Sequence, residues 1–411
     1  MEQRYETVIV GGGVAGGALG LMLARAGKSV LILEKSVEYP DRVRGEWFAP
    51  WGVVEARRIG IYDLLRGAGG HHLKRHVPFG DDIPDVETAE ASALDLTALI
   101  PGIPGPLCLR HPVICQVLTD AAAAAGATIL RGVNNVRVCP GAAPEVTFDH
   151  DGAGHRVRCE LIVGADGRTG VSRRQAGIVE HADPQHHLFS GLLIENAHGF
   201  PEDIQTKGTE GDVNFLVFPQ GNGRVRLYLG YASDRKGFLS GPDAPRRFLD
   251  AFRLKTLPYS DAIVNATPVS RCYSYPNNDT WVDTPYVEGL VLVGDAAGHN
   301  DPITGQGLSI SLRDVRIVGE SLLSSNSWDT RQFEAYAEER RERMRRLRFA
   351  AALQAAVDAV FGPEAEAQRR RIREKRMADP TLSLPLAGVM VGPENIPAEA
   401  FTQEVWDRTF A

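Results

Sequence analysis

Short apolar runs that end in glycine mark the beginning of the chain. Residues 7–10 predict a buried strand, the glycines after them predict a turn, and a helix is expected to begin near Val14. A second apolar run, residues 29–33, predicts the next strand. Strand, helix and strand in this order are typical of an α/β protein with a parallel sheet.

Two later apolar runs repeat this pattern. Residues 161–163 lead into Gly164-Ala165-Asp166-Gly167, and residues 290–293 lead into Gly294-Asp295. Each run predicts a buried strand whose carboxyl end carries an aspartate. Ligands bind at the carboxyl ends of strands in α/β sheets, so both aspartates are candidate ligand-binding residues.

Residues 181–278, between these two runs, alternate apolar and polar positions. A period of two predicts strands, and Asn222-Gly223 predicts a hairpin turn between two of them. The expected strands cover residues 188–194, 213–219, 225–231 and 270–275, with one helix over 243–254. This segment is therefore expected to form an antiparallel sheet.

The remaining patterns predict connecting helices and strands. Expected helices cover residues 52–65, 113–125, 308–323 and 332–361, and expected strands cover 107–110, 127–130, 136–138, 145–148 and 157–159. Residues 338–348 mix both signs of charge, which favours a solvated helix face with i,i+4 pairs. Beyond residue 362, short pieces interrupted by proline are expected to wrap the first domain.

Composition and charge narrow the class of protein. The chain has 411 residues, 43% hydrophobic and 24% charged, which is typical of a soluble globular protein. Its formal net charge of −7 gives a nucleic-acid partner no electrostatic support. No apolar run approaches the ~18 residues of a membrane helix, and the first strand begins too early to leave room for a signal peptide.

The cysteines are scattered and form no C-x-x-C motif: Cys108, Cys115, Cys139, Cys159 and Cys272. An odd number without a motif is typical of reduced thiols, so the protein is expected to be cytoplasmic. No metal site is expected from the sequence.

Gly11, Gly13 and Gly16 form a G-x-G-x-x-G motif at the first strand–helix turn. The first glycine permits the tight turn, the second lets the backbone approach a pyrophosphate, and the third lets the helix pack closely on the strand. Glu34 ends the second strand at about the 20-residue distance expected for an acid that binds a ribose hydroxyl. The motif predicts a dinucleotide site, and an ordinary glycine turn is the alternative.

Arg42 and Arg44 flank Val43, so both project to the same side if this segment is extended. Two guanidinium groups suit phosphate binding, although a solvated basic turn explains the pattern equally well. Gly221 and Gly223 lack a third glycine, so the chain carries a single dinucleotide motif. A stable NAD(P)H site is therefore not expected.

These motifs together resemble those of the single-component flavoprotein aromatic hydroxylases, the group typified by para-hydroxybenzoate hydroxylase. The similarity covers about residues 6–361 and rests on the opening glycine motif with Glu34, on Gly164-Ala165-Asp166-Gly167, and on Gly294-Asp295-Ala296-Ala297. The resemblance implies an α/β fold: a Rossmann-like FAD-binding domain with an inserted antiparallel β-sheet substrate domain and C-terminal helices.

The resemblance also implies the domain layout and the cofactor. Residues 1–73, 100–180 and 280–362 are expected to form the FAD-binding domain, residues 74–99 and 181–279 the substrate domain, and residues 363–411 a helical tail. The residues carried over as binding FAD are Gly11, Gly13, Ala15, Gly16, Glu34, Lys35, Arg42, Arg44, Gly45, Arg110, Asp166, Gly167, Asp295, Gly305, Gln306, Gly307 and Leu308.

The sequence departs from the family pattern beside the third motif. The histidine that usually follows Asp-Ala-Ala is Gly298, with His299 one place later, and the usual Pro-Pro is Asp301-Pro302. Thr304 stands where the family usually has glycine. Asp301 and Pro302 are predicted near the reactive face of the flavin and are the candidate catalytic residues. Candidate residues around the substrate are Trp47, Phe48, Phe218 and Tyr228.

The function implied by the resemblance is that of an FAD-dependent monooxygenase. It would use transient NAD(P)H and O2 to hydroxylate an aromatic or polyketide-like small molecule through a flavin C4a-hydroperoxide. The alternatives are a flavin-dependent reductase or dehydrogenase, a non-catalytic flavin-binding protein, and a halogenase, although the Trp-x-Trp-x-Ile-Pro segment of the family's halogenases is absent. No nucleic-acid or membrane partner is expected, and monomer and homodimer both stay open.

Overall fold

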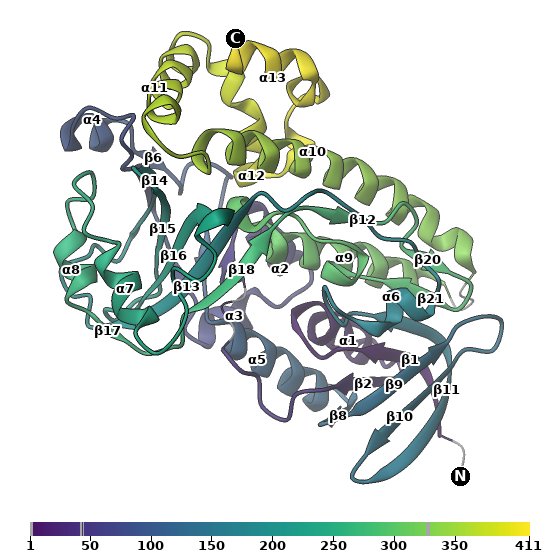
Figure 1. The fold of residues 1–411 in the computed structure, drawn as a ribbon. Helices are drawn as coiled ribbons and strands as arrows, with labels where there is room; N and C mark the ends of the chain where they lie inside the picture. Colours follow the sequence, from purple (N-terminus) through teal and green to yellow (C-terminus); the bar gives the residue numbers. More distant parts are fainter. Residues whose placement is uncertain (1–2, 42, 44, 326–328) are drawn as a thin grey trace.

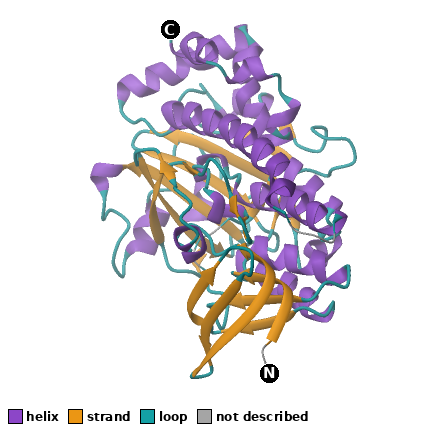
Figure 2. Ribbon diagram, turned by 90° about the vertical axis from the view of Figure 1, so that its right-hand side faces the viewer, coloured by secondary structure: helices purple, strands orange, loops and turns teal. Residues whose placement is uncertain are grey.

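The computed structural model describes residues 3–41, 43, 45–325 and 329–411. Two large β-sheets form its centre, with helices packed around them (Figure 1). The helices beyond α10 (Glu334–Asp358) gather at the end of the molecule opposite the N-terminus (Figures 1 and 2). The predicted α/β fold with C-terminal helices is confirmed.

The first sheet has the strand order β20-β21-β11-β1-β2-β8, and β10 and β9 continue from β11 as antiparallel neighbours. Its parallel pairs are β1 with β2, β1 with β11, β2 with β8 and β11 with β21. The strands are β1 (Gln3–Val10), β2 (Val30–Glu34), β8 (Thr128–Arg131), β9 (Asn134–Cys139), β10 (Glu145–His150), β11 (Ala153–Gly164), β20 (Tyr286–Val287) and β21 (Leu290–Leu292).

This sheet is apolar on both faces because both are covered. Ile9 belongs to the core shared with α1 (Val14–Arg25), α5 (His111–Ala124) and α9 (Gly307–Ser324). Val8 and Val10 point the other way and pack with Val146 and Phe148 of the β9–β10 hairpin. The hairpin projects near the N-terminus (Figure 2). Alternate residues of one strand thus fill two cores, which explains the unbroken apolar runs.

The parallel register brings the ends of four strands to one edge. Val10 pairs with both Leu33 and Gly164, and Gly164 pairs with Leu292. The turns that follow β1, β2, β11 and β21 therefore open side by side. The three sequence motifs sit in these turns, so their convergence follows directly from the strand order.

The second sheet is largely antiparallel, in the order β17-β13-β16-β15-β14-β5-β6, with β18 beside β13. One face packs against α7 (Ala244–Asp250) and α8 (Ser260–Val264), and the other faces the first sheet's turns and α10. Its strands are β5 (Arg75–Pro78), β6 (Leu94–Asp95), β13 (His187–Glu195), β14 (Ile204–Glu210), β15 (Val213–Pro219), β16 (Val225–Ala232), β17 (Thr267–Pro268) and β18 (Tyr273–Asn277).

Smaller elements complete the chain. Two short sheets join β3 (Trp47–Phe48), β7 (Leu107–Cys108) and β4 (His71–His72), and β12 (His181–Ala182) and β19 (Thr280–Trp281). The other helices are α2 (Pro50–Arg58), α3 (Tyr62–Gly67), α4 (Val86–Ala91), α6 (Val171–Gln175), α11 (Pro363–Ala378), α12 (Leu384–Val391) and α13 (Gln403–Phe410).

Several predicted elements need correction. The helix expected over 52–65 is two helices, because Gly60 takes a left-handed conformation (φ +71°) between them. The strands expected at 157–159 and 161–163 are one strand, β11. The helix expected over 243–254 ends at Asp250. Strand β14 was not predicted, because its sequence IQTKGTE contains glycine and little apolar alternation.

In the described part of the chain, no helix is both long and apolar enough to cross a bilayer.

Candidate FAD and substrate site

One continuous cavity of about 1950 Å³ runs between the turns of the first sheet and the inner face of the second. This volume exceeds the ~300–1,000 Å³ of a typical ligand pocket, so it has room for a dinucleotide and a second molecule. The predicted cofactor residues that line it are Gly11, Gly13, Ala15, Glu34, Lys35, Gly45, Asp166, Gly167, Asp295, Gly305, Gln306, Gly307 and Leu308.

The glycines of the first turn have three different surroundings. A Cβ on Gly11 would lie 2.4 Å from the Ala165 carbonyl oxygen, and one on Gly16 would lie 1.9 Å from the Gly11 carbonyl oxygen. A Cβ on Gly13 would meet no described atom within 4 Å. Gly11 and Gly16 are therefore required by packing, whereas Gly13 opens onto the cavity. Gly13 is also the N-cap of α1 and supplies no side-chain cap, so the first N–H groups stay available to an anion.

Glu34 is held by backbone groups at the cavity wall. One carboxylate oxygen accepts the Gly12 N–H (2.8 Å) and the other accepts the Ser36 N–H (2.7 Å). The Tyr39 hydroxyl donates to the Gly12 carbonyl and closes the same turn (2.6 Å). A carboxylate fixed by two N–H groups keeps lone pairs for a ribose hydroxyl.

Asp166 braces the turn after β11. One of its oxygens accepts the backbone N–H (2.9 Å) and the hydroxyl (3.0 Å) of Ser172, at the start of α6. Its other oxygen is buried and has no hydrogen-bond partner in the described residues. Gly170 must be glycine here, since a Cβ would lie 2.1 Å from the Asp166 carboxyl carbon.

Asp295 lies on the 3-10 turn η2 (Gly294–Ala297) and pairs with Arg168 across the cavity wall (Oδ2–Nε 3.3 Å). The turn is anchored from behind, because the Gly294 N–H donates to buried Asp314 (2.9 Å). Asp314 in turn pairs with Arg340 (3.1 Å) and Arg343 (2.6 Å) of α10.

Arg340 and Arg343 correct the prediction that residues 338–348 form a solvated face. Both side chains are buried, and they belong to the support of the Gly-Asp motif. Burial raises the pKa of Asp314, but Arg340 and Arg343 lower it further, so the pKa lies below its ordinary value. The i,i+4 charge pattern could not reveal this, because the carboxylate comes from another helix.

The N-terminus of α9 forms the part of the wall beside Asp295. Gly305 is left-handed (φ +69°) at the end of the 3-10 turn η3 (Pro302–Thr304), with Trp47 packed against it. The Gln306 amide accepts from the Trp51 indole (2.8 Å) and donates to the Thr304 carbonyl (2.6 Å). These bonds hold the helix N-terminus, and with it the positive end of the helix dipole, toward the cavity.

Of the three arginines predicted at the phosphates, Arg110 lies in the described part of the chain. Arg42 and Arg44 lie outside the described residues. Arg110 is the N-cap residue of α5, and its Nε has no hydrogen-bond partner in the described part of the chain. Arg110 is not among the residues that line the cavity, so the fit to a pyrophosphate-bearing cofactor rests on the open Gly13 turn and the free N–H groups of α1.

Beyond the cofactor residues the cavity is aromatic. Three aromatic rings line this part: Trp47, Phe218 and Tyr228. The Phe218 ring centroid lies 6.0 Å from that of Trp47 and 6.0 Å from that of Tyr228. The prediction that Phe48 lies around the substrate is corrected, because Phe48 alternates with Trp47 on β3 and is buried in the core of the first sheet. The Trp47 indole donates to Gln205 (2.8 Å).

The same chamber has a polar side and a helical wall that the sequence did not predict. His76, Gln205 and Lys207 line it from the second sheet. Burial, and secondarily Lys207, lowers the pKa of His76 to about 3, so this ring is neutral. Helix α12 contributes further lining residues: Leu386, Ala387, Val389 and Met390. These residues could not be predicted, because no local sequence pattern indicates that the tail packs beside the second sheet.

Buried charges join the second sheet to the cofactor half. Arg226 donates to Glu46 (2.8 Å) and Asp41 (2.9 Å). Glu46 itself lines the cavity one residue before Trp47. A buried guanidinium between two carboxylates holds this segment in place, and truncating Arg226 would leave both carboxylates without their counter-charge.

Asp301 and Pro302 separate at the cavity wall. Pro302 lines the cavity, whereas the Asp301 carboxyl lies behind the wall, accepting the Ile303 N–H (2.9 Å) and facing His186. The Asp301 N–H donates to Asp279 (2.9 Å). Burial, with Asp279 adding to it, raises the pKa of Asp301 to about 7. His299, shifted by one place, also lines the cavity, and its ring lies 2.8 Å from the Thr280 hydroxyl.

Comparison with known proteins also indicates an FAD-binding protein. Residues 4–350 match the family described as FAD binding domain. The chain is 25% identical over 346 residues to digeranylgeranylglycerophospholipid reductase 2 of Methanococcoides burtonii, covering 78% of this chain and 75% of that protein. It is 27% identical over 341 residues to squalene epoxidase erg1 of Aspergillus fumigatus, covering 79% and 67%.

Two solved structures share the fold. The p-nitrophenol 4-monooxygenase PnpA from Pseudomonas putida DLL-E4 superposes with a TM-score of 0.77 at 16% identity, over 100% of this chain and 99% of that one. The anhydrotetracycline hydroxylase OxyS from Streptomyces rimosus gives 0.72 at 20% identity, over 95% and 76%. The fold of this chain is thus also that of two hydroxylating enzymes, as the resemblance implied. The chain belongs to the FAD binding domain family, and its cofactor is FAD.

Proposed function

We propose that the protein is a monooxygenase that uses NAD(P)H and O2 to hydroxylate a large, mostly apolar aromatic or polyketide-like molecule. One observation carries this proposal: a single cavity joins the FAD turns to an aromatic-lined chamber. A molecule in that chamber would lie against the end of the cofactor marked by Pro302 and the α9 N-terminus. FAD supplies the redox chemistry, and the chain supplies position, shelter from water and charge.

The protein's contributions can be assigned to its residues. The α1 N-terminus and Glu34 would bind the pyrophosphate and ribose, and Asp295 the ribityl chain. The N–H groups at the start of α9 would stabilise negative charge on the reduced cofactor. Trp47, Phe218 and Tyr228 would position a flat apolar substrate, since aromatic faces stack with little loss of side-chain freedom. The polar side at His76, Gln205 and Lys207 would bind an oxygen substituent.

NAD(P)H is proposed as a transient cosubstrate. The chain has one glycine-rich dinucleotide turn, and FAD would occupy it. A hydride donor therefore has no second site of this kind along the sequence and would approach from the chamber side.

Oxygen labelling of the purified FAD-bound protein tests the proposal. A panel of one- to four-ring phenols and anthraquinones is screened for stimulation of NAD(P)H oxidation, and active compounds are incubated under ¹⁸O₂. We expect one ¹⁸O atom in the product by mass spectrometry. NAD(P)H consumption without labelled product across the whole panel would overturn oxygen insertion while leaving the protein a flavoprotein.

A flavin-dependent reductase of carbon–carbon double bonds is the second candidate. It is favoured by the similarity to a digeranylgeranylglycerophospholipid reductase. The apolar chamber also suits an isoprenoid chain. Anaerobic turnover separates the two, because a reductase reduces its substrate without O2, whereas a hydroxylase forms no product.

A further inference from the structure

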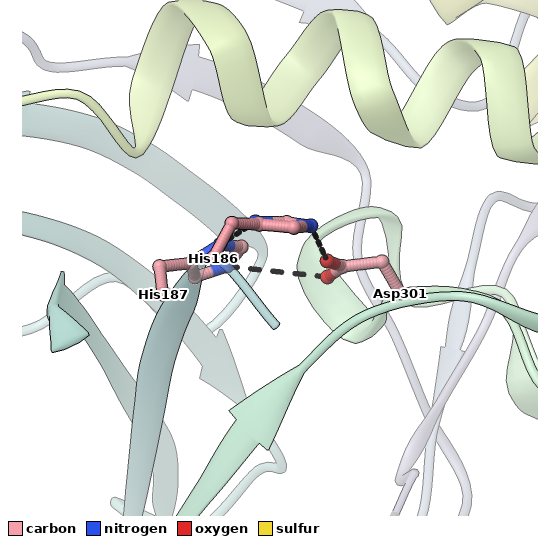
Figure 3. Close-up of side chains that lie close together, drawn as sticks. All are labelled: His186, His187 and Asp301. Carbon is pink, nitrogen blue, oxygen red and sulfur yellow. Dashed lines mark hydrogen bonds and ion pairs between the residues drawn. The ribbon is translucent and has the colours of Figure 1, made fainter. Parts of the chain in front are cut away.

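A chain of polar side chains lies behind the cavity wall and is not used by the function proposed above. Asp301 Oδ2 is 3.3 Å from His186 Nε2, and His186 Nδ1 is 2.6 Å from His187 Nδ1 (Figure 3). His187 Nε2 is 2.8 Å from the Asn277 amide nitrogen. Asp301, His187 and Asn277 are buried, whereas 41% of the His186 side chain is exposed.

With Asp301 ionised, every hydrogen of this chain can be assigned. The Asn277 amide donates to His187 Nε2, and the His187 Nδ1–H donates to His186 Nδ1. The remaining His186 hydrogen is then on Nε2, which lies 3.3 Å from Asp301 Oδ2 as an ion-pair contact. Each imidazole is neutral in this state. Burial supports neutral rings, since it lowers the pKa of His186 and that of His187, the latter to about 3.

When Asp301 is protonated, the same hydrogen bonds can form with donors and acceptors exchanged. The carboxylic O–H would donate to His186 Nε2, the His186 Nδ1–H to His187 Nδ1, and the His187 Nε2–H to the Asn277 carbonyl oxygen after the amide turns over. That oxygen is buried and has no hydrogen-bond partner in the described residues, and neither has Asp301 Oδ2 apart from the ion pair. The cluster can therefore accommodate both protonation states of Asp301 by exchanging tautomers.

Charged groups around Asp301 raise or lower the pKa of its carboxyl. Asp279 accepts the Asp301 N–H and raises the pKa of the Asp301 carboxyl, whereas Arg168, across the wall, lowers that pKa. Asp183 faces both His186 and Asp279, and Arg348 of α10 faces Asp279 and Asp183. A further negative charge in the cavity would add to the effect of Asp279.

We propose that Asp301 takes up one proton, through His186, when the FAD in the cavity is reduced. A hydride donor delivers two electrons and one proton, which leaves one added negative charge in the cavity. Asp301 directly precedes Pro302 and holds Ile303, both of which line that cavity. The proton on His186 Nε2 passes to the Asp301 carboxylate, and the exposed His186 ring takes one proton from water in its place. One proton is thereby added to the cluster, and the negative charge at Asp301 is removed. The proposal rests on FAD reduction and not on oxygen insertion.

Two imidazoles and a carboxylate are also a metal-ligand set. The hydrogen bonds favour the proton path, because the two Nδ1 atoms are 2.6 Å apart and His187 Nε2 faces an amide donor. Stoichiometric binding of Zn²⁺ that is lost in His186→Gln would overturn the proposal.

The flavin potential of the FAD-bound protein, measured in chelator over roughly pH 5.5 to 8.5, is the main test. One proton per two electrons changes the reduction equilibrium tenfold per pH unit, or about 30 mV, and two protons change it twice as steeply. We expect the wild type to show the steeper slope in part of this range. Asp301→Asn, which keeps an oxygen for the Ile303 N–H, should show about 30 mV per unit throughout.

His181→Gln is the matched control. His181 is also 41% exposed and also faces a carboxylate, Asp283, but that partner lies at the surface. His181→Gln should keep the wild-type slope and the wild-type rate of proton uptake, followed with a pH indicator during anaerobic reduction. His186→Gln should slow that uptake about tenfold or more. A wild-type slope of one proton throughout, or unchanged uptake in His186→Gln, would contradict the proposal.

A second readout needs neither turnover nor substrate. Infrared difference spectra between acid and alkaline pH should show a carboxylic C=O band that is absent in Asp301→Asn and present in His181→Gln. Lack of hydroxylation would refute the proposed function and leave these results unchanged. A steep potential slope that persists in Asp301→Asn would refute the proton path alone.

Discussion

At the residue scale, Glu34 shows how a single carboxylate organises the dinucleotide turn. Its two oxygens accept two different backbone N–H groups, from Gly12 and Ser36. A glutamine has one acceptor oxygen, so Glu34→Gln would turn an amide N–H₂ toward one of these donors. Hydrogen bonds to charged groups contribute about 1.5–3 kcal/mol, which corresponds to about tenfold or more in affinity.

We therefore expect Glu34→Gln to weaken FAD binding by about tenfold to a hundredfold in a fluorescence titration. Glu38→Gln is the control, because Glu38 is exposed four residues further along. Equal FAD affinity in wild type and Glu34→Gln would remove Glu34 from the cofactor site.

Asp279 and Asp301 predict a pH dependence of stability. Burial is the first cause that raises the pKa of each carboxyl, to about 6 and about 7. A group whose pKa is higher in the folded state stabilises the fold fully below its unfolded pKa, ~3.9, and this contribution is lost as pH rises through the folded pKa. The two groups should therefore make the fold progressively less stable from about pH 4 to pH 7.

Asp301→Asn removes one of these titrations. Relative to wild type, its free energy of unfolding should improve by on the order of 2 kcal/mol between about pH 5 and pH 8, in urea titrations. Asp283→Asn, at an exposed aspartate, should follow the wild type at both pH values. A constant difference between Asp301→Asn and wild type would show that Asp301 does not titrate in this range.

At the element scale, the first βα turn separates packing from cofactor binding. Gly16 lies against the Gly11 carbonyl, whereas Gly13 faces open space. Gly13→Ala should keep the melting temperature of the FAD-free protein within about 2 °C but lose most FAD affinity, because the methyl group occupies the approach of the pyrophosphate. Gly16→Ala should lower that melting temperature by about 5 °C or more, since helix and strand must move apart.

Thermal denaturation with and without FAD measures both effects. The prediction is contradicted if Gly13→Ala still gains the full wild-type increase in melting temperature on adding FAD.

Helices α9 and α10 meet around one buried carboxylate, Asp314. Asp314→Asn would leave buried Arg340 without its carboxylate partner and Arg343 with Glu339 alone, and should cost about 3–5 kcal/mol of unfolding free energy. It should also weaken FAD binding, because Asp314 holds the Gly294 N–H. Glu342→Gln, which breaks half-exposed pairs with Arg345 and Arg346, should cost less than about 1 kcal/mol. Similar urea midpoints for both variants would contradict this account.

The same elements show what a sequence can reveal. The glycine motif, Glu34 and Asp295 could be predicted because each sits at a fixed distance from a strand end, and the strand order then brings those ends together. Arg168, Asp314 and His186 could not, because each has a charged partner more than twenty residues away in another element. Arg340 was misread for this reason: the i,i+4 pattern is local, but its burial depends on α9.

At the scale of the whole molecule, the cavity is lined in part by the far end of the chain. Met390 and Leu386 of α12 line the chamber together with Phe218 of the second sheet. The sequence predicted only that the tail wraps the first domain, since an apolar helix carries no sign of which surface it covers. The structure makes the tail part of the chamber wall, so it is expected to limit substrate size.

Met390→Trp tests this role. A larger side chain in the wall should leave less room, so KM for three- and four-ring aromatic substrates should rise about tenfold or more while that for one-ring phenols changes less than about threefold. The matched control is Met377→Trp on α11, where the native side chain is 69% exposed. It should leave both KM values unchanged. Equal effects of Met390→Trp on small and large substrates would mean that α12 supports the fold without shaping the chamber, and the size limit would then have to come from the second sheet alone.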